Sequence, residues 1–312
     1  MKYYIGVDGG GTKTAFALFD ENKNMLCNVE GKGSNHENYD NGFDDAVAVI
    51  WQGLNDLCNK AEINFDDVSF TLMGLAGIDH PWQHDKMCAM LSELGLKNFE
   101  IYNDGFIVIK AGSISGVAIG YNCGTGVCCN GIDSNGNAMQ LMGLGDFTGD
   151  ISGGTNIAVK AFEIAYNELY LRMYTSAVTK NIMKIYGFTT REEVVDLVGH
   201  LENMEGEHIR NFISAFFDAA NEGDKVALDY CEAMAERGAR AIHGLTQELT
   251  FNGDEVEVVL SGSINVKLPN QPYLDMLKAK AEAYTGKKLQ FIKLTEMPVV
   301  GCINWIMQEY AK

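Results

Sequence analysis

The chain has 312 residues, 46% of them hydrophobic, and its 42 acidic side chains outnumber 24 basic ones, giving a formal net charge of -18 at pH 7. This length predicts two domains with separate cores, and the negative charge argues against nucleic acid or an anionic membrane as the main partner. No uncharged apolar run reaches about eighteen residues and charges occur early in the chain, so we expect a cytoplasmic protein without a membrane span or a secretory signal.

The first hundred residues alternate strand and helix patterns. Runs of β-branched and aromatic residues predict strands at residues 3–7, 15–19, 25–29, 68–73 and 99–102. Apolar residues at helical spacing predict helices at 43–60 and 81–94, the second with Pro81 in its first turn and Gly95 at its end. The predicted order is three antiparallel strands, then helix, strand, helix and strand.

A second cycle begins near Gly112, where residues 113–116 have the composition of a linker. Strands are predicted at 117–121, 127–131, 255–260 and 289–294, the first two joined as a hairpin by a glycine tip. Helices are predicted at 151–171, from Arg191 behind a Thr190–Glu193 capping box, and at 209–220, 224–249, 273–284 and 300–310. Hairpins that alternate with helices favour an α/β fold with mixed sheets.

Eight cysteines are scattered along the chain, and the sequence contains no Cys-x-x-Cys pair. In a chain without export signals, this distribution predicts reduced thiols rather than a disulfide framework. His80 and His84 lie four residues apart beside acidic residues, as helical zinc ligands can. Pro81, however, places His80 before the helix and no third strong ligand stands out, so we interpret the pair as a solvated helix start.

Residues 8–14 read Asp-Gly-Gly-Gly-Thr-Lys-Thr at the turn between two predicted strands. Three successive glycines leave backbone N–H groups able to approach phosphate oxygens, and Asp8 could hold Mg²⁺ through water. The candidate ATP ligands of this first glycine tip are Gly9, Gly10, Gly11, Thr12 and Lys13. A plain glycine-rich turn is the alternative. The segment is not a P-loop, because Thr12 separates Gly11 from Lys13.

Two further small-residue turns follow predicted strands. The second glycine tip, Gly124, Thr125 and Gly126, repeats the strand, tip and strand setting of the first, and two such tips can hold the phosphates of one nucleotide. Gly262 and Ser263 end a buried strand just before a helix, as an adenosine platform requires; an ordinary strand-to-helix turn is the alternative.

In this order and spacing, the three segments resemble the phosphate-1, phosphate-2 and adenosine motifs of the actin, heat-shock and sugar-kinase superfamily. Within it, the chain is similar to N-acetylglucosamine kinases of the BadF/BadG/BcrA/BcrD-type ATPase family, nearly from end to end. The resemblance implies two actin-like, ribonuclease H-like lobes with mixed sheets and a cleft between them. The first lobe would comprise residues 1–112 and 297–312, and the second, nucleotide-binding lobe residues 113–296.

The same resemblance implies an ATP-dependent kinase that uses Mg²⁺, with a small-molecule sugar as substrate, in a homodimer. Asn35 and His36 match the sugar-binding loop of that branch, and Asp104 matches its catalytic aspartate, which also contacts the substrate. The segment that closes over the sugar is matched by three further residues, namely Gly143, Gly145 and Asp150. The implied reaction transfers the γ-phosphoryl group to a hydroxyl, the 6-OH being expected.

The residues themselves leave alternatives at these positions. Asp104 follows a short strand and could act as a general base, or it could cap the helix that begins near Gly105. Asn35 and His36 could bind sugar hydroxyls or simply face solvent. Asp150 could bind a hydroxyl or cap a helix that starts at Ile151.

Three positions depart from the family pattern. Val127 stands where many relatives carry Ser, Ile151 where Glu often follows Gly-Asp, and Leu144 where an aromatic residue can lie over the sugar. These changes leave N-acetylmuramic acid, glucosamine and other hexoses open as substrates, beside N-acetylglucosamine.

Two other functions are compatible with the same motifs. One is an ATP-driven activator of a 2-hydroxyacyl-CoA dehydratase or benzoyl-CoA reductase, with an iron–sulfur cluster held by Cys123, Cys128 and Cys129. Cys128 and Cys129 alternate in direction along a predicted strand, which is a poor arrangement for joint ligation. The other is a sugar sensor that retains the fold without catalysis.

Overall fold

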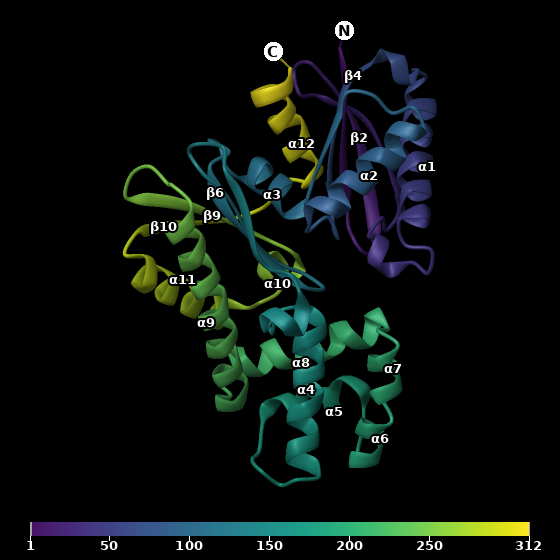
Figure 1. Ribbon diagram of the computed structural model, residues 1–312. Helices are drawn as coiled ribbons and strands as arrows, with labels where there is room; N and C mark the ends of the chain where they lie inside the picture. Colours follow the sequence, from purple (N-terminus) through teal and green to yellow (C-terminus); the bar gives the residue numbers. More distant parts are fainter. Residues whose placement is uncertain (1, 312) are drawn as a thin grey trace. The chain divides into compact units, whose positions relative to one another are not determined.

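The computed structural model describes residues 2–311, which divide into two compact units, each built on a five-stranded sheet with packed helices (Figure 1). Among these residues the first unit comprises 2–120, 131–136 and 294–311, and the second comprises 121–130 and 137–293. Within the described part of the chain, no helix combines the length and apolarity needed to cross a bilayer.

The sheet of the first unit has the strand order β3-β2-β1-β4-β5. Its strands are β1 (Tyr3–Gly9), β2 (Lys13–Asp20), β3 (Met25–Lys32), β4 (Val68–Leu75) and β5 (Phe99–Tyr102). The pairs β1–β2 and β2–β3 are antiparallel, whereas β1–β4 and β4–β5 are parallel. The carboxyl ends of β1, β4 and β5 therefore meet at one edge of the sheet, the usual position of a ligand site in such sheets.

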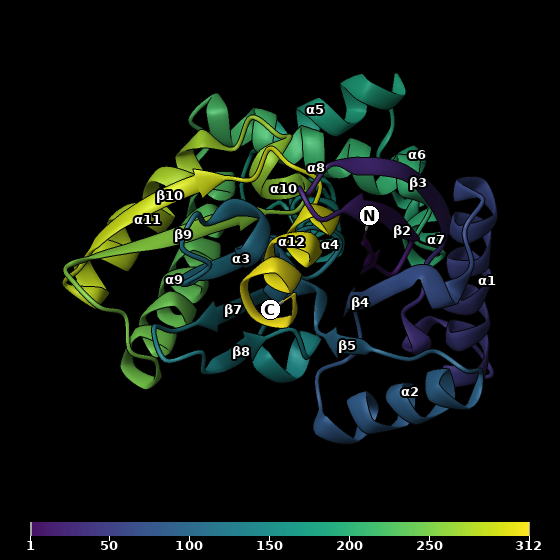
Figure 2. The same ribbon diagram turned by 90° about the horizontal axis from the view of Figure 1, so that it is seen from above.

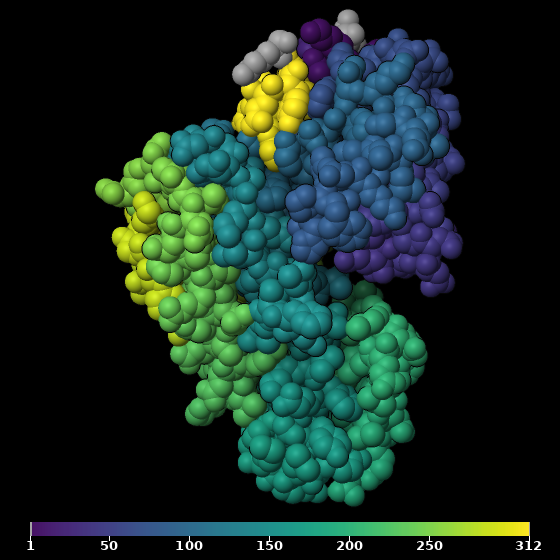
Figure 3. Space-filling view, viewed as in Figure 1, coloured from purple at the N-terminus to yellow at the C-terminus, as the bar shows by residue number. Residues whose placement is uncertain are grey.

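Helices cover this sheet and bury its apolar side chains. They are α1 (Phe43–Ala61), α2 (Pro81–Glu93), α3 (Asp104–Gly112) and α12 (Val299–Trp305), with the short turns η1 (His36–Asn38) and η2 (Phe65–Asp67) and the π-helical segment η4 (Ile306–Tyr310). Helix α1 packs on β2 and β3, while α12 packs on α3 and β1. Figure 3 shows this C-terminal segment on the surface beside parts of the first 112 residues.

The C-terminal segment supports the strand that leads to Asp104. The Trp305 ring stacks on Tyr102 of β5, with ring centroids 3.9 Å apart. The hydroxyl groups of Tyr102 and Tyr310 lie 2.6 Å apart, and Tyr310 stacks on Phe70 of β4 at 4.5 Å. Stacked aromatic rings contribute beyond their buried area, so these contacts stabilise the end of β5.

The sheet of the second unit has the order β10-β9-β6-β7-β8. Its strands are β6 (Ala118–Cys123), β7 (Val127–Ile132), β8 (Ala138–Met142), β9 (Glu255–Ser261) and β10 (Lys288–Lys293). The helical segments are η3 (Gly145–Thr148), α4 (Gly154–Leu169), α5 (Ala177–Tyr186), α6 (Arg191–Val195), α7 (Val198–Glu202), α8 (Gly206–Asn221), α9 (Lys225–Glu248), α10 (Ser263–Val266) and α11 (Gln271–Thr285). Helices α9 and α11 pack together and against the sheet, and α8 packs on α4 and α5 (Figure 2).

The predicted strands and the main predicted helices are all present, with differences at three places. Strand β8 was not predicted, because it is half-exposed and its sequence has no clear alternation. Helix α5, which begins behind a Ser176 cap, was also missed. The helix expected from residue 151 begins at Gly154 instead. The Gly154 N–H donates to the Gly124 carbonyl of the second glycine tip, and residues 151–153 lie outside the helix.

Candidate active site

Three carboxyl groups gather at the carboxyl edge of the parallel strands of the first unit. Asp8 near the end of β1 is in register with Gly74 of β4, which is in register with Tyr102 of β5. Asp104 follows β5 by two residues, and Asp79 lies on the segment after β4. The charges of Asp8 and Asp79 both act on Asp104, so the fold brings together groups that lie 25 to 96 residues apart in the chain.

Asp104 is the first residue of α3, but it does not cap that helix. The cap is Asn103, whose side-chain oxygen accepts a hydrogen bond of 2.9 Å from the Gly105 N–H. The Asn103 amide nitrogen donates to Asp79 Oδ1 at 3.0 Å. The alternative that Asp104 caps the helix is therefore wrong. Asn103, the residue before Asp104, is the cap, and it also holds the Asp79 carboxylate.

The electrostatics of the site raise the pKa values of two carboxyl groups. Burial and the negative charges of Asp8 and Asp79 raise the pKa of Asp104 to about 7. Burial also raises the pKa of Asp8 to about 6, although the charge of Lys13 opposes this change. A carboxyl group that titrates near neutral pH can accept a proton at the pH of a cell, which is the requirement for a general base.

The predicted sugar loop lies in the same unit. His36 is buried and its ring stacks on Phe43, with centroids 3.9 Å apart, so the interpretation of a solvated histidine is wrong. Its Nδ1 has no hydrogen-bond partner among residues 2–311, and burial lowers the pKa of the ring, which favours the neutral form. The Asn35 side-chain oxygen accepts from the Glu37 N–H at 3.0 Å. Gly77, at a φ of +80°, lies against both residues, and a Cβ there would overlap the Asn35 oxygen.

The first glycine tip is held by its own backbone. The Gly10 N–H donates to the Lys13 carbonyl at 2.9 Å, and the Gly10 carbonyl accepts from Ser34 at 3.0 Å. The Lys13 ammonium forms an ion pair of 2.7 Å with Glu30 on the exposed surface. Thr12 is exposed at the end of this tip, and the Gly11 carbonyl accepts from the side chain of Asn38 at 3.1 Å.

The second glycine tip and the end of β9 meet in the second unit. The Gly124 N–H donates to the Gly126 carbonyl at 2.9 Å, which closes the turn. Gly262 has a φ of +81°, and a Cβ there would overlap the carbonyl group of Cys123 just before the tip. At Gly126, by contrast, no atom of the described chain lies within 4 Å of an added Cβ. The packing of the protein itself therefore does not explain why residue 126 is a glycine.

Asp150 organises the segment that precedes α4. Its Oδ2 accepts from the N–H groups of Gly143 and Gly145 at 2.8 and 3.0 Å and from the Thr148 hydroxyl at 2.9 Å. Because the helix starts only at Gly154, the alternative that Asp150 caps it is wrong. Asp150 Oδ1 is buried and has no partner in the part of the chain that the structure describes. The described chain therefore leaves the hydrogen-bonding capacity of this one oxygen unused.

Sequence reasoning missed three residues of these two regions. Asp79 and Asn103 form the hydrogen bond beside Asp104, yet neither was proposed as a site residue. The available signals were the glycine at 77 before Asp79 and the Asn-Asp pair at 103–104. In the loop held by Asp150, Phe147 is 98% exposed, an unusual state for a large aromatic side chain. The sequence offered no signal for its exposure.

Two mixed five-stranded sheets flanked by helices are the architecture of actin-like sugar kinases. A candidate N-acetylglucosamine kinase from Chromobacterium violaceum has this fold, with a TM-score of 0.72, 18% sequence identity and coverage of 99% of both chains. The model of the BadF/BadG/BcrA/BcrD ATPase family matches residues 5–290. The chain therefore belongs to this family.

Two curated relatives match over most of their length. The chain is 25% identical to an N-acetyl-D-glucosamine kinase from Dictyostelium discoideum, over 92% of this chain and 96% of the relative. It is 22% identical to an N-acetylmuramic acid/N-acetylglucosamine kinase from Clostridium acetobutylicum, over 85% of this chain and 86% of the relative.

The raised pKa of Asp104 predicts a pH-dependent cost to stability. With a pKa of about 7, against an ordinary value of 3.8, the folded state keeps its proton to higher pH than the unfolded state. The wild type should therefore lose free energy of unfolding between about pH 4 and pH 7, by at most about 4 kcal/mol. Asp104→Asn cannot ionise, so its advantage over the wild type should grow across this range in urea unfolding.

Asp20→Asn is the control of opposite sign. Hydrogen bonds from Asn24 and Asn22 lower the pKa of Asp20, so its contribution to stability is present at neutral pH and is lost on acidification. Asp20→Asn should therefore be less stable than the wild type at neutral pH, and this difference should shrink on acidification. An Asp104→Asn difference that stayed constant from pH 4 to pH 8 would contradict the raised pKa.

Proposed function

We propose that this protein is an ATP-dependent sugar kinase that transfers the γ-phosphoryl group to a hydroxyl, the 6-OH, of N-acetylglucosamine or a related amino sugar. The observation that carries the proposal is the Asp104 carboxyl at the end of β5, with a pKa of about 7. The family match and the two curated kinases support the same reaction class.

In this reaction Asp104 acts as the general base. Its carboxylate accepts the proton of the attacking sugar hydroxyl, whose oxygen forms a bond to the γ-phosphorus. The bond from that phosphorus to the bridging oxygen breaks, and ADP leaves with the electron pair. A general base works best when its pKa lies near the working pH, because it is then largely ionised and still has a high affinity for a proton. Asp104 meets this condition by itself. Asn103 and Asp79 hold the segment in position.

We assign sugar recognition to side-chain polar atoms that have no hydrogen-bond partner, or only a long hydrogen bond, among the described residues. His36 Nδ1 is unpartnered among the described residues, and the neutral ring can donate or accept a hydrogen bond. The oxygen of the Asn35 side chain is used locally, whereas its amide nitrogen makes only a 3.5 Å contact with Glu37. In the second unit, Asp150 Oδ1 is the atom proposed to bind a sugar hydroxyl. The N–H groups of Gly143 and Gly145 donate to the other carboxylate oxygen, Oδ2, and so fix the side chain.

Nucleotide binding is assigned to the two glycine tips and to the end of β9. The open space beside Gly126 supports the approach of a phosphate group to the backbone, because a side chain there would meet no protein atom in the described chain. Gly262 and Ser263 lie directly beside this tip and are assigned to the adenosine. In the first unit, Gly9 to Lys13 are assigned to the phosphates.

Asp8 is the residue proposed to hold Mg²⁺, directly or through a water molecule. Asp8 is half-buried, and burial raises the pKa of its carboxyl while the charge of Lys13 opposes this effect. A carboxylate oxygen is the ligand type that Mg²⁺ prefers. When bound, the ion supplies charge neutralisation for the phosphate groups during transfer.

The alternative of an iron–sulfur activator has little support. Cys123 and Cys129 are fully buried, and burial raises the pKa of both thiols well above the ordinary range. The Cys123 thiol donates to the Ser152 carbonyl at 2.7 Å, inside the second unit. Thiols in such surroundings are not available to a cluster, which requires accessible thiolates.

Replacement of the proposed base tests the function. Asp104→Asn keeps the shape of the side chain but cannot accept the proton, so sugar-dependent ADP release should fall about 100-fold or more. ATP affinity, measured by calorimetry, should stay near the wild-type value. The exposed Asp66→Asn serves as the matched control in the same unit and should keep full turnover. A folded Asp104→Asn protein with near-normal turnover would refute the assignment.

A second variant tests the nucleotide site by itself. Gly126→Val fills space that no described protein atom occupies, so it should weaken ATP binding about tenfold while the melting temperature changes little. Gly199→Val is the control, because an added Cβ at Gly199 also meets no atom within 4 Å in the described residues, far along the chain from either tip. Equal ATP affinity in both variants would mean that the tip is only a turn.

A further inference from the structure

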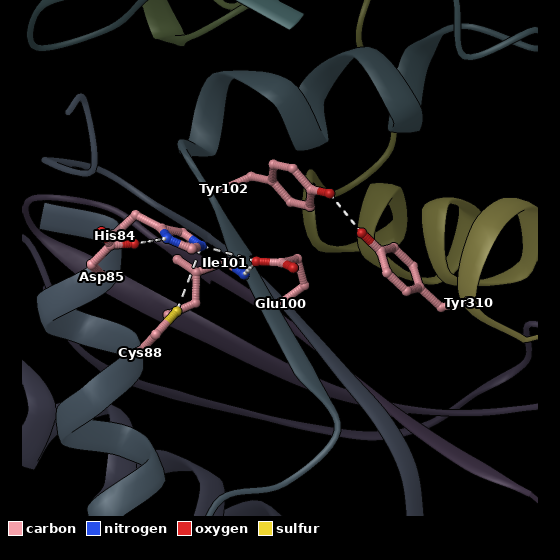
Figure 4. Close-up of polar contacts among 7 residues, drawn as sticks. All are labelled: His84, Asp85, Cys88, Glu100, Ile101, Tyr102 and Tyr310. Carbon is pink, nitrogen blue, oxygen red and sulfur yellow. Dashed lines mark hydrogen bonds and ion pairs between the residues drawn. The ribbon is translucent and has the colours of Figure 1, made fainter. Parts of the chain in front are cut away.

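Three side chains with metal-binding chemistry meet where α2 lies against β5 in the first unit. His84 and Cys88 are four residues apart on α2, and therefore on the same face of the helix, while Glu100 comes from β5 (Figure 4). A nitrogen of His84, the sulfur of Cys88 and a carboxylate oxygen of Glu100 all lie within 4.8 Å of one another. All three residues are half-buried.

The distances between these atoms are close to those that a tetrahedral zinc ion requires. With Zn–N and Zn–O bonds of about 2.1 Å and a Zn–S bond of about 2.3 Å, tetrahedral angles place N and S about 3.6 Å apart and N and O about 3.4 Å apart. In the protein, His84 Nε2 lies 3.6 Å from Cys88 Sγ and 3.0 Å from Glu100 Oε1. The first distance equals the tetrahedral value and the second is shorter by a few tenths of an ångström, while the Cys88 and Glu100 ligand atoms lie within 4.8 Å of each other.

Two further groups orient these side chains. Asp85 Oδ1 lies 3.2 Å from His84 Nδ1, the ring nitrogen that faces away from the cluster. The Ile101 N–H donates to Glu100 Oε1 at 3.0 Å (Figure 4). A carboxylate behind a metal-bound histidine fixes the tautomer of the ring and is a regular feature of zinc sites.

We propose that His84, Cys88 and Glu100 bind a zinc ion, with Asp85 as the group that orients His84. Imidazole, thiolate and carboxylate together are the ligand set of zinc rather than of Mg²⁺ or Ca²⁺, and three protein ligands leave one tetrahedral position for water. The negative charges of Glu100 and Asp85 both act on Cys88, and a bound cation would offset them.

The sequence analysis considered His80 as the helical partner of His84 and interpreted the pair as a solvated helix start rather than a metal site. His80, four residues before His84, ends outside the cluster, because it precedes α2 and its N–H donates to the side chain of Gln83 at 2.8 Å. The helix partner of His84 is instead Cys88, one turn further on, and the third ligand comes from another element.

A second group, His200, Glu205 and His208 in the second unit, also meets the distance criterion for a metal site. Its two imidazole rings stack with centroids 4.1 Å apart, and His208 Nδ1 lies 2.9 Å from the Tyr186 hydroxyl. Stacked rings do not direct their nitrogen lone pairs at a common point, and Glu205 is exposed. This group therefore serves as an internal control.

A zinc ion at the proposed site would connect α2 to the strand that ends next to Asn103 and Asp104. We expect zinc to raise the melting temperature of the full chain by several degrees, because an ion that binds only the folded state stabilises it.

The test is titration of the chelator-treated full-length protein with Co²⁺ under a phosphine reductant, followed by displacement with Zn²⁺. We expect one equivalent of Co²⁺ to produce a thiolate-to-cobalt charge-transfer band and the intense visible bands of four-coordinate cobalt. Cys88→Ser should lose the charge-transfer band, and Asp85→Asn should bind about tenfold more weakly. Cys27→Ser, at another half-buried free cysteine, and His200→Ala should bind as the wild type does.

Circular dichroism of each metal-free variant separates loss of the site from loss of the fold. If Cys88→Ser does not fold, Glu100→Gln provides the same test of the ligand set through weaker Co²⁺ and Zn²⁺ binding. The proposal is overturned if the wild type gives no charge-transfer band at one equivalent, if the band survives in Cys88→Ser, or if only His200→Ala abolishes binding.

Discussion

The parallel pairing of β1, β4 and β5 is the constraint on which the candidate site depends. Its register places Asp8, Gly74 and Tyr102 in one row across the sheet, so the segments that follow each strand emerge at the same edge. Carboxyl groups from all three segments are thereby brought close enough for their charges to interact. The pKa of Asp104 near neutrality is a consequence of this crowding and of burial, not of any single partner.

Crowded carboxyl groups cost stability, and the surrounding structure offsets that cost. Asn103 caps α3 and donates to Asp79, and the aromatic contacts of Tyr102 with Trp305 and Tyr310 hold the end of β5 against the C-terminal segment. Strained or destabilised groups are typically retained where function requires them. The proposed zinc ion would add a further constraint on β5 from the side of α2, through Glu100.

Local patterns were sufficient to predict most strands and helices and the turns at both glycine tips, because each depends on neighbouring residues. The role of Asp104 was inferred mainly from the family resemblance and stays a prediction. Local patterns were insufficient where a role depends on tertiary contacts. Asp79 becomes relevant only through tertiary contacts, namely its hydrogen bond with Asn103 and its charge beside Asp104, and the late start of α4 depends on a hydrogen bond to Gly124, thirty residues away. For the same reason the partners of His84 were not foreseen, since Glu100 belongs to a different element.

In the proposed reaction, ATP turnover depends on an amino sugar. The most direct measurement is ADP release by the purified wild-type protein with N-acetylglucosamine, N-acetylmuramic acid, glucosamine and glucose, with phosphorus NMR of the products. ADP release should occur only when an accepted sugar is present, with one equivalent of a sugar 6-phosphate formed per ADP. Sugar binding without turnover, or ATP hydrolysis that is indifferent to every sugar, would contradict it.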